Sequence, residues 1–346
     1  MNRIALITVL VWSAITICTS CNKTNDEGTH CPCSKRELNA GNSWEIKWEN
    51  AEDNFVGIEN ISFENYPKVD GSTSANILNT MVACKLLGVR YMWMTLVQEW
   101  FLQPACMEIP EQFDRCGFFW ERVKTSQTHG AFMNLINGEV DIILTHRTIS
   151  PDEKDHADKA GITLIETPIA LDAFVFVVNK DNPIKSLTIS QIQKIYTKEI
   201  TNWAQVGGNK EEMKVFTRPR NSGSEEVFRE LVMYGLEPAD FPEAQIGSMA
   251  FVFSEVINNK NSICYSFSTY KDLQARVSCN EVPVIAINSI CPSESTVKNR
   301  TYPFIAEVHV AIRSDLDPNS MAYKLYEWLQ SENAKYTIAE CGFLPK

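Results

Sequence analysis

The run Ala173-Phe174-Val175-Phe176-Val177-Val178 decides the fold class of this chain of 346 residues. Its residues are apolar without alternation, which is typical of a strand buried on both faces of a parallel or mixed sheet. On both sides of this run, from about Trp44 to the end, short strand-like segments alternate with helical patterns. This alternation predicts an α/β fold rather than an all-α or all-β fold.

The positions of the other elements follow from apolar periodicity and from helix-ending residues. Strands are expected at residues 58–69, 140–144, 164–179, 213–216, 262–267 and 304–312. Helices are expected at residues 75–87, 131–137, 188–196, 225–234 and 320–340. The third of these helices opens on Thr188-Ile189-Ser190-Gln191, a capping box. The stretch 92–119 is rich in Trp and Phe and is interpreted as an irregular insertion.

The N-terminus has the pattern of an export signal. Arg3 precedes an apolar run over residues 4–17, and Cys18-Thr19-Ser20-Cys21 follows it. The run is shorter than the roughly 20 residues that span a bilayer. Because the last four residues resemble a bacterial lipobox, Cys21 is the predicted lipidation site, after a signal peptide at 1–20 and before a polar tether at 21–43. An ordinary cleaved signal and an anchor helix are the alternatives.

Export permits disulfides, and nine of the 11 cysteines follow the lipobox. Cys31-Pro32-Cys33 lacks the second ligand pair of a metal site and is interpreted as part of the tether. The pairs Cys106/Cys116 and Cys279/Cys291 are close enough in sequence to bond, although the sequence does not establish connectivity.

The charge balance limits the function classes. Asp and Glu number 43 against 32 Lys and Arg, which gives a net charge of −11. Nucleic acid is excluded as a partner, because its phosphates need a basic face. Any anion bound here must be held by local donors, since the overall field repels it.

Three segments place hydroxyl and glycine residues directly ahead of an expected helix: Asp70–Ser74, Thr125–Gly130 and Arg218–Ser224. The first turn of a helix presents unpaired backbone N–H groups and the positive end of the dipole, which bind anions. Glycine lets an oxyanion approach the backbone, Ser and Thr add hydroxyl donors, and Arg218 adds a charged donor matched to phosphate geometry. Singly, each segment is also an ordinary helix N-cap. Together they predict one shared anion site.

The sequence lacks the motifs of catalysis. It has no GxxxxGK[ST], GxGxxG, HExxH or G-x-S-x-G pattern. Five histidines are present without metal-ligand spacing: His30, His129, His146, His156 and His309. The chain is therefore predicted to be a binding protein rather than an enzyme, without cofactor or metal.

An ordered series of motifs extends from about residue 61 to the C-terminus. It comprises Val69–Ser74, Gly138–Ile143, Pro168–Asn179, Ile195-Tyr196 with Ile200–Trp203, Arg218 with Ser222-Gly223-Ser224, and Cys341–Pro345. This series resembles the periplasmic phosphate-binding component of ABC phosphate importers. The resemblance implies a two-lobed, type II periplasmic-binding-protein fold, with mixed sheets flanked by helices and a hinge of crossover strands. The lobes are expected at 44–170 and 171–284, with a return to the first lobe at 285–346.

The resemblance also implies a function and a set of binding residues. The protein would capture inorganic phosphate outside the cytoplasmic membrane and deliver it to an ABC permease, as a lipid-anchored monomer of the cell envelope. The ligand would lie dehydrated between the lobes. Carried over to this sequence, its binders are Ser72, Thr73, Thr128, the backbone near His129, Arg218, Ser222, Gly223 and Ser224. Arg220 is the rival of Arg218, because only one of two arginines around Pro219 need face the cleft.

Phosphate near neutral pH carries a proton that sulfate lacks, so a carboxylate acceptor in the site can distinguish the two anions. In the best-known relatives an Asp follows the strand that corresponds to residues 140–144, but His146 stands there in this chain. Asp70 is the predicted substitute, and a turn or cap residue is its other interpretation. A protonated His146 acting as a cation is the alternative.

Two other function classes stay open at this point. An exported hydrolase of phosphate esters would use the same anion site, but it needs a metal cluster or an activated nucleophile. A sensory or surface lipoprotein would keep the fold without the ligand.

Overall fold

The computed structural model describes residues 30–32, 55–96, 99–105, 116–274 and 280–346. The apolar run Ala173–Val178 lies in β5 (Leu164–Val178), and every residue from Ile169 to Val178 is buried. Burial on both faces explains why this strand has no polar alternation in that part. The predicted α/β class is confirmed.

One mixed, seven-stranded sheet extends through the molecule in the order β1-β4-β10-β5-β8-β7, and β11 (Leu344–Pro345) also pairs with β5. β1 (Val69–Gly71) runs parallel to β4 (Ile142–Thr145). β7 (Lys214–Val215) runs parallel to β8 (Ser262–Phe267). β10 (Ile305–Arg313) is antiparallel to both β4 and β5, so the two longest strands lie side by side in the centre.

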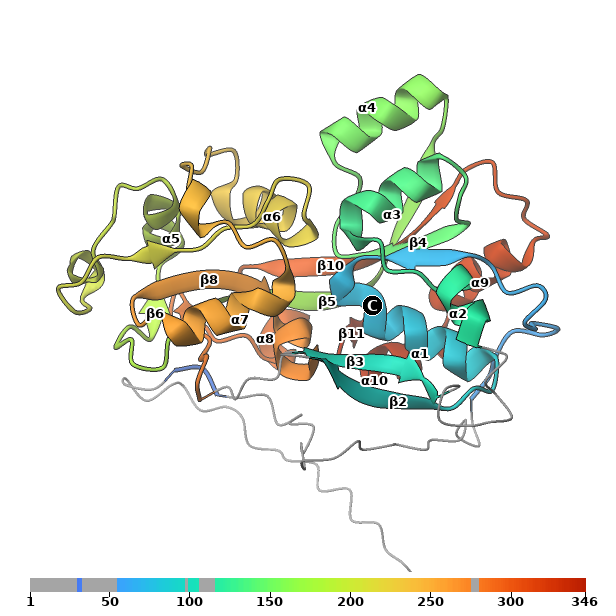
Figure 1. Cartoon of the computed structure of the whole chain (residues 1–346), viewed down its shortest axis with the longest axis horizontal. Helices are drawn as coiled ribbons and strands as arrows, with labels where there is room; N and C mark the ends of the chain where they lie inside the picture. The colour runs from blue at the N-terminus through green and yellow to red at the C-terminus, as the bar shows by residue number, and fades with distance from the viewer. Residues whose placement is uncertain (1–29, 33–54, 97–98, 106–115, 275–279) are drawn as a thin grey trace, which may run out of the picture.

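Two main hydrophobic cores define two lobes. In β5, Ala170 belongs to the first core, whereas the strand from Leu171 onward belongs to the second. In β10, Ala306 belongs to the second core and Val308 to the first. Both strands therefore cross from one lobe to the other, as Figure 1 shows.

Helices cover the sheet in each lobe (Figure 1). The first lobe contains α1 (Asn76–Leu86), α2 (Cys116–Arg122), α3 (Gln127–Ile136), α4 (Pro151–Ala160), α9 (Met321–Leu329) and α10 (Glu332–Glu340). The second lobe contains α5 (Ile189–Tyr196), α6 (Gly223–Val227), α7 (Met249–Asn258) and α8 (Glu294–Lys298). Short elements complete the described chain: η1 (Thr73–Ala75), η4 (Trp203–Val206), η5 (Phe228–Met233), η6 (Pro242–Ala244), η7 (Tyr270–Gln274), β2 (Tyr91–Leu96), β3 (Glu99–Pro104), β6 (Ser186–Leu187) and β9 (Ala286–Ile287).

Several predicted elements are confirmed. α1 and β8 lie where periodicity placed them, and α5 begins with the predicted capping box. There the Gln191 N–H donates to Thr188 Oγ1 over 3.1 Å, and the Thr188 N–H donates to Gln191 Oε1 over 2.8 Å.

Four predictions of local structure are wrong. Residues 58–68 form turns instead of a strand, because Asn60 has a φ of 61° and Pro67 has no N–H for a sheet ladder. The stretch 92–119 is not irregular throughout, since β2 and β3 pair with each other as a hairpin. The helix predicted at 320–340 is two helices, separated near Ser331, whose Oγ donates to the Trp328 carbonyl over 2.7 Å. Ile285, Val297 and Phe304 belong to the second core, although a return to the first lobe was expected from residue 285.

The structure establishes a cysteine pairing that the sequence left open. Cys31 forms a disulfide with Cys291, so Cys279, which is close enough in sequence to bond with Cys291, is not its partner. The Cys31 N–H also donates to the Val284 carbonyl over 3.1 Å. This part of the predicted tether is therefore attached to the second lobe. Cys116 is disulfide-bonded as well, while Cys106, which is close to it in sequence, lies outside the described residues.

Cys21, the predicted lipidation site, also lies outside the described residues. Within the described ranges, no helix has both the length and the apolar composition of a membrane span.

Candidate functional site

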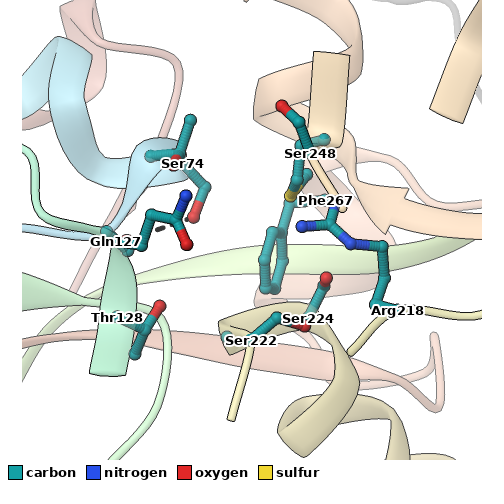
Figure 2. Close-up of a pocket in the computed structure, with 12 residues that line it drawn as sticks. Ser74, Gln127, Thr128, Arg218, Ser222, Ser224, Ser248 and Phe267 are labelled. Carbon is teal, nitrogen blue, oxygen red and sulfur yellow. Dashed lines mark hydrogen bonds between the residues drawn. The ribbon is translucent and has the colours of Figure 1, made fainter. Parts of the chain in front are cut away.

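A pocket lies where helix starts from both lobes converge. In the first lobe these are the starts of η1 and α3, and in the second lobe the starts of α6 and α7. Figure 2 shows the two sets facing each other, with Ser74, Gln127 and Thr128 on one side and Arg218 and Ser248 on the other. The lining residues are Ser72, Thr73, Ser74, Gln127, Thr128, Arg218, Ser222, Gly223, Ser224, Ser248, Met249 and Phe267. The structure thus brings the three segments predicted from sequence to one site.

The first loop enters the pocket directly from β1. A Cβ on Gly71 would lie 2.6 Å from the Leu144 carbonyl oxygen, so only glycine fits between β1 and β4 here. The Ser72 N–H then donates to the same carbonyl over 3.0 Å. The Ser72 hydroxyl makes no capping bond to its own helix and lies 3.2 Å from Ser74 Oγ. At this loop the hydroxyl is directed at the pocket wall rather than used as an N-cap.

Asp70 does not line the pocket. Its Oδ1 accepts from the Gly71 N–H over 2.7 Å and from the Ser126 N–H over 2.8 Å, and its Oδ2 accepts from Asn134 Nδ2 over 2.8 Å. The carboxylate is fully buried and joins the end of β1 to the loop before α3. Asp70 therefore positions the first two loops, as the turn interpretation has it, and it is not among the residues that line the pocket.

The third loop supplies the charged donor. Arg218 is 7% exposed, and its Nη2 donates to the Gly247 carbonyl over 3.4 Å. The rival Arg220 points to the surface, where it pairs with Glu237 at 3.5 Å. Ser222 caps α6, because its Oγ accepts from the Glu225 N–H over 3.3 Å. The structure thus places Arg218 at the pocket and Arg220 outside it.

Gly223 and Ser224 line the pocket at the start of α6, where Gly223 lies against Thr128 of the other lobe. The Ser224 Oγ is buried and has no hydrogen-bond partner among the described residues. A buried hydroxyl without a hydrogen-bond partner lowers the stability of the folded protein unless a ligand or water bonds to it. A Cβ on Gly223 would lie only 2.4 Å from Thr128 Oγ1 of the opposite lobe. Glycine is therefore required here for α6 to approach α3.

The electrostatics of the pocket favour an anion. Arg218 is the one charged residue among those that line it, and none of them is a carboxylate. Glu225 lies in the first turn of α6 but faces Arg229, whose Nε donates to it over 2.8 Å, and it also accepts from the Tyr265 hydroxyl. The negative charge of Glu225 is thus compensated by partners outside the pocket. The helix starts and Arg218 therefore determine the field that acts on a ligand.

His146 also lies behind the pocket wall. Its Nδ1 is 2.9 Å from Ser74 Oγ, and its Nε2 is 3.3 Å from Asp172 Oδ2. The ring packs against Phe267 in a tilted arrangement, with centroids 4.2 Å apart. Both Ser74 and Phe267 line the pocket, so His146 acts through them and does not itself contact the cavity.

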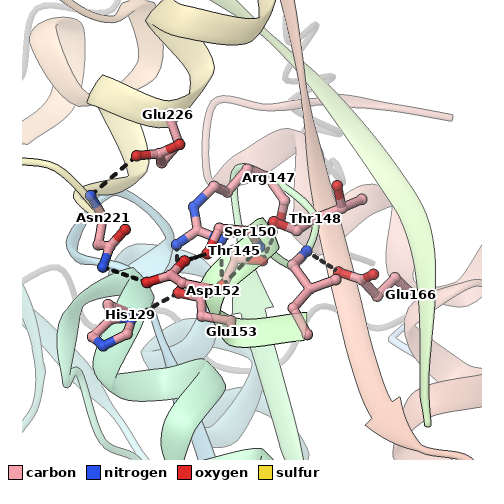
Figure 3. Close-up of polar contacts among 11 residues, drawn as sticks. His129, Thr145, Arg147, Thr148, Ser150, Asp152, Glu153, Glu166, Asn221 and Glu226 are labelled. Atoms are coloured by element: carbon pink, nitrogen blue, oxygen red, sulfur yellow. Dashed lines mark hydrogen bonds and ion pairs between the residues drawn. The ribbon is translucent and has the colours of Figure 1, made fainter. Parts of the chain in front are cut away.

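A polar network borders the site on the side of α4 (Figure 3). Arg147 donates two bonds of 2.7 Å to the buried Glu153, and His129 Nδ1 donates to Glu153 Oε1 over 2.9 Å. Burial by itself would raise the pKa of the Glu153 carboxyl, but the hydrogen bonds and charge of Arg147 hold it below its ordinary value. This side chain is consequently an ionised brace for the loop that follows β4.

Sequence reasoning missed five lining residues: Ser74 as a contact, Gln127, Ser248, Met249 and Phe267. Ser248 and Met249 open α7, whose apolar segment Met249–Phe253 was the available signal for a fourth helix start. Gln127 has a φ of 63°, which no sequence pattern here predicts for glutamine. Among the described residues, no group of three His, Cys, Asp or Glu side chains has the arrangement of a metal site.

Solved structures and curated proteins resemble this chain. An ABC-type phosphate transport receptor from Vibrio cholerae is 23% identical, with a TM-score of 0.54 over 80% of this chain and 99% of that one. A high affinity periplasmic phosphate-binding protein called PfluDING is 13% identical, with a TM-score of 0.56 over 81% and 90%. At these identities the likeness shows the fold.

Two relatives by sequence are Protein SphX of Synechococcus elongatus and the phosphate-binding protein PstS of Bacillus subtilis. SphX is 28% identical over 230 residues, 64% of this chain and 68% of its own length. PstS is 22% identical over 196 residues, 56% of this chain and 61% of its own length. A family model described as the PBP superfamily domain matches residues 119–333, which is more than half of the chain. The chain therefore belongs to the PBP superfamily.

Proposed function

We propose that this protein captures inorganic phosphate outside the cytoplasmic membrane and delivers it to an ABC permease. The observation that carries the proposal is the pocket between the lobes, where hydroxyl groups, Gly223 and Arg218 meet without a carboxylate. The phosphate-binding names of the relatives support the same ligand.

The geometry suits capture of a dehydrated anion. Backbone N–H groups at the helix starts and the Ser and Thr hydroxyls replace the water around the ligand. Ser224 Oγ is already buried without a partner among the described residues, so a bound oxygen would satisfy it. Arg218 supplies the compensating charge. Since Ser72 and Thr128 come from one lobe and Arg218 and Ser224 from the other, the ligand would hold the lobes together.

Export and anchoring belong to the same proposal. The apolar segment at 4–17 and the lipobox at Cys21 favour a lipid-anchored protein of the cell envelope, and the disulfide between Cys31 and Cys291 suits an oxidising compartment. Replacing Cys21 by Ala is expected to block processing or release the protein from membranes. A processed, membrane-bound variant would place the anchor elsewhere.

Equilibrium dialysis with radiolabelled phosphate tests the ligand. The expected result is saturable binding of one phosphate per chain, weakened about ten- to a hundredfold in Arg218→Ala by loss of a charge-assisted bond. Arg220→Ala is the matched control and should bind like the wild type. A folded wild-type protein that binds no phosphate would overturn the proposal.

A further inference from the structure

Asp172, His146 and Ser74 form a chain of hydrogen bonds that ends at the pocket. Asp172 Oδ2 is 3.3 Å from His146 Nε2, and His146 Nδ1 is 2.9 Å from Ser74 Oγ. Asp172 is 4% exposed, His146 is 2% exposed and Ser74 is 4% exposed, so water does not compete for these bonds. The ring is held by Phe267 on one side and by Phe343, whose centroid is 5.4 Å away.

The hydrogen bonds around Asp172 bear on which atom is the donor in each bond of this three-residue series. Asp172 Oδ1 accepts from the Ala173 N–H over 2.8 Å and from the Thr269 N–H over 3.2 Å, which leaves Oδ2 to face His146. A carboxylate oxygen only accepts hydrogen bonds, so His146 Nε2 carries the proton that faces it. With the imidazole neutral, Nδ1 is an acceptor.

In this form of His146, Ser74 donates its one proton to Nδ1. A serine hydroxyl also has two acceptor positions, and these remain for other groups. Ser72 Oγ, at 3.2 Å, can occupy one of them as a donor. The other is available to the pocket that Ser74 lines.

We propose that His146 and Asp172 orient the Ser74 hydroxyl so that it accepts the hydrogen bond from the P–OH of bound phosphate. The inference rests on the proposed phosphate function and assigns the selectivity of the same site. The lining residues include no carboxylate that could take this role, and Asp70 is occupied by three N–H donors. Sulfate has no proton to donate, so its oxygen would face the lone pair of Ser74, and it is rejected. Ser74 is the specificity-determining residue, and His146 and Asp172 are positioning residues.

The position of the proton on the His146 ring can be measured directly in the wild type. Nitrogen-15 NMR should show His146 as the neutral tautomer with its proton on Nε2, assigned by the loss of its signals in His146→Gln. Phosphate should bind this form. A proton on Nδ1 in the phosphate complex would overturn the inference, because Ser74 would then be forced to donate into the pocket.

Asp172→Asn changes this proton order without changing the shape of the side chain. The Asn carbonyl must stay at the Oδ1 position to accept the two backbone N–H groups, so its NH₂ faces His146 Nε2. The histidine proton then moves to Nδ1 and donates to Ser74, whose own proton turns to the pocket. Calorimetric titration should show the ratio of sulfate to phosphate dissociation constants falling by about tenfold or more, together with the tautomer change in NMR.

Asp70→Asn is the matched control, since it removes a buried carboxylate that the proposal does not use. It should weaken both anions together and keep their ratio. Ser74→Ala should lose affinity for phosphate but not for sulfate, and it tests the role of Ser74 even if Asp172→Asn does not fold.

The outcomes separate the two proposals. A wild type that binds neither anion defeats the phosphate function and this inference with it. A wild type that binds phosphate, with unchanged selectivity in both Asp172→Asn and Ser74→Ala, defeats the inference alone. Selectivity lost in Asp70→Asn instead assigns the acceptor role to Asp70. Hydrolysis of p-nitrophenyl phosphate that disappears in Ser74→Ala would make Ser74 a nucleophile and overturn the acceptor role.

Discussion

Asn221 Nδ2 of the second lobe donates a hydrogen bond to Asp152 Oδ2 of the first lobe over 2.7 Å (Figure 3). Asn221 lies between Arg218 and α6, and Asp152 lies in the first turn of α4. The hydrogen bonds from Ser150 and Asn221 hold the pKa of Asp152 below its ordinary value, although burial opposes them. The bond bridges the lobes beside the pocket, so it exists only while they are close together.

Removing this bridge should speed release of the ligand. Asn221 has a φ of 66°, so Asn221→Gly removes the amide without straining the backbone. An exposed hydrogen bond contributes about 0.5–1.5 kcal/mol, so phosphate dissociation should accelerate up to about tenfold in stopped-flow measurements. Asp152→Ala should behave alike, and the double variant should add no further effect. Independent, additive effects of the two changes would contradict a bond across the cleft.

The brace formed by Arg147 and Glu153 should make stability depend on pH. The folded pKa of Glu153 is lowered, so its stabilising effect is present above the ordinary carboxyl pKa and is lost as pH falls through the folded value. Breaking a buried pair costs about 3–5 kcal/mol, and Glu153→Gln should lose stability in that range at neutral pH. Urea unfolding at a series of pH values measures both effects.

Glu166 is the matched control for Glu153. Burial is the largest influence on the pKa of Glu166 and raises it. The Ile149 N–H donates to Glu166 Oε1 over 2.7 Å. A raised carboxyl pKa disfavours the ionised form in the folded state, so Glu166→Gln should alter the pH profile with the opposite sign. The same change in the pH dependence of stability from both variants would show that the brace has no specific role.

The disulfide between Cys31 and Cys291 should stabilise the second lobe. It joins residues 260 positions apart and fixes a segment that also bonds to Val284. Loss of a disulfide costs about 2–4 kcal/mol, chiefly because the unfolded chain gains freedom. Cys291→Ser and Cys31→Ser should therefore each lower the stability measured by chemical unfolding, and the double variant should equal either single one. A further loss in the double variant would mean that the cysteines act separately.

The sequence predicted the three main loops because each carries hydroxyl and glycine residues before a helix, a pattern that needs no tertiary information. It did not predict the direction of Asp70, since a carboxylate at a strand end can face a ligand or its own backbone. The hydrogen bonds of His146 could not be predicted from the sequence either, because Ser74 and Asp172 lie 72 and 26 residues from His146.

The wrong predictions of the fold also concern features that depend on contacts between distant parts of the sequence. Strand propensity in residues 58–69 was overridden by turns at Asn60, and the β2–β3 hairpin satisfies its backbone bonds outside the main sheet. The pairing of Cys31 with Cys291 depends on how the chain returns to the second lobe. Proximity in sequence therefore could not establish the connectivity.

Gly223 should control closure of the lobes. Because a Cβ at this position would lie 2.4 Å from Thr128 Oγ1, Gly223→Ala should keep α6 from reaching its present distance from α3. Phosphate would then lose its simultaneous contacts with both lobes, and its affinity should fall by about a hundredfold or more, equivalent to at least two lost hydrogen bonds. Hinge closure around a ligand is common in two-lobed proteins.

Small-angle X-ray scattering tests this directly. Phosphate should reduce the radius of gyration of the wild type, and it should not reduce that of Gly223→Ala at a saturating concentration. Gly117→Ala is the matched control, because no atom lies within 4 Å of the added Cβ, and it should close normally. Adding Thr128→Ala to Gly223→Ala removes the atom at 2.4 Å and should restore part of the closure despite the lost hydroxyl. Closure by Gly223→Ala equal to that of the wild type would show that the contact between α3 and α6 does not limit the motion.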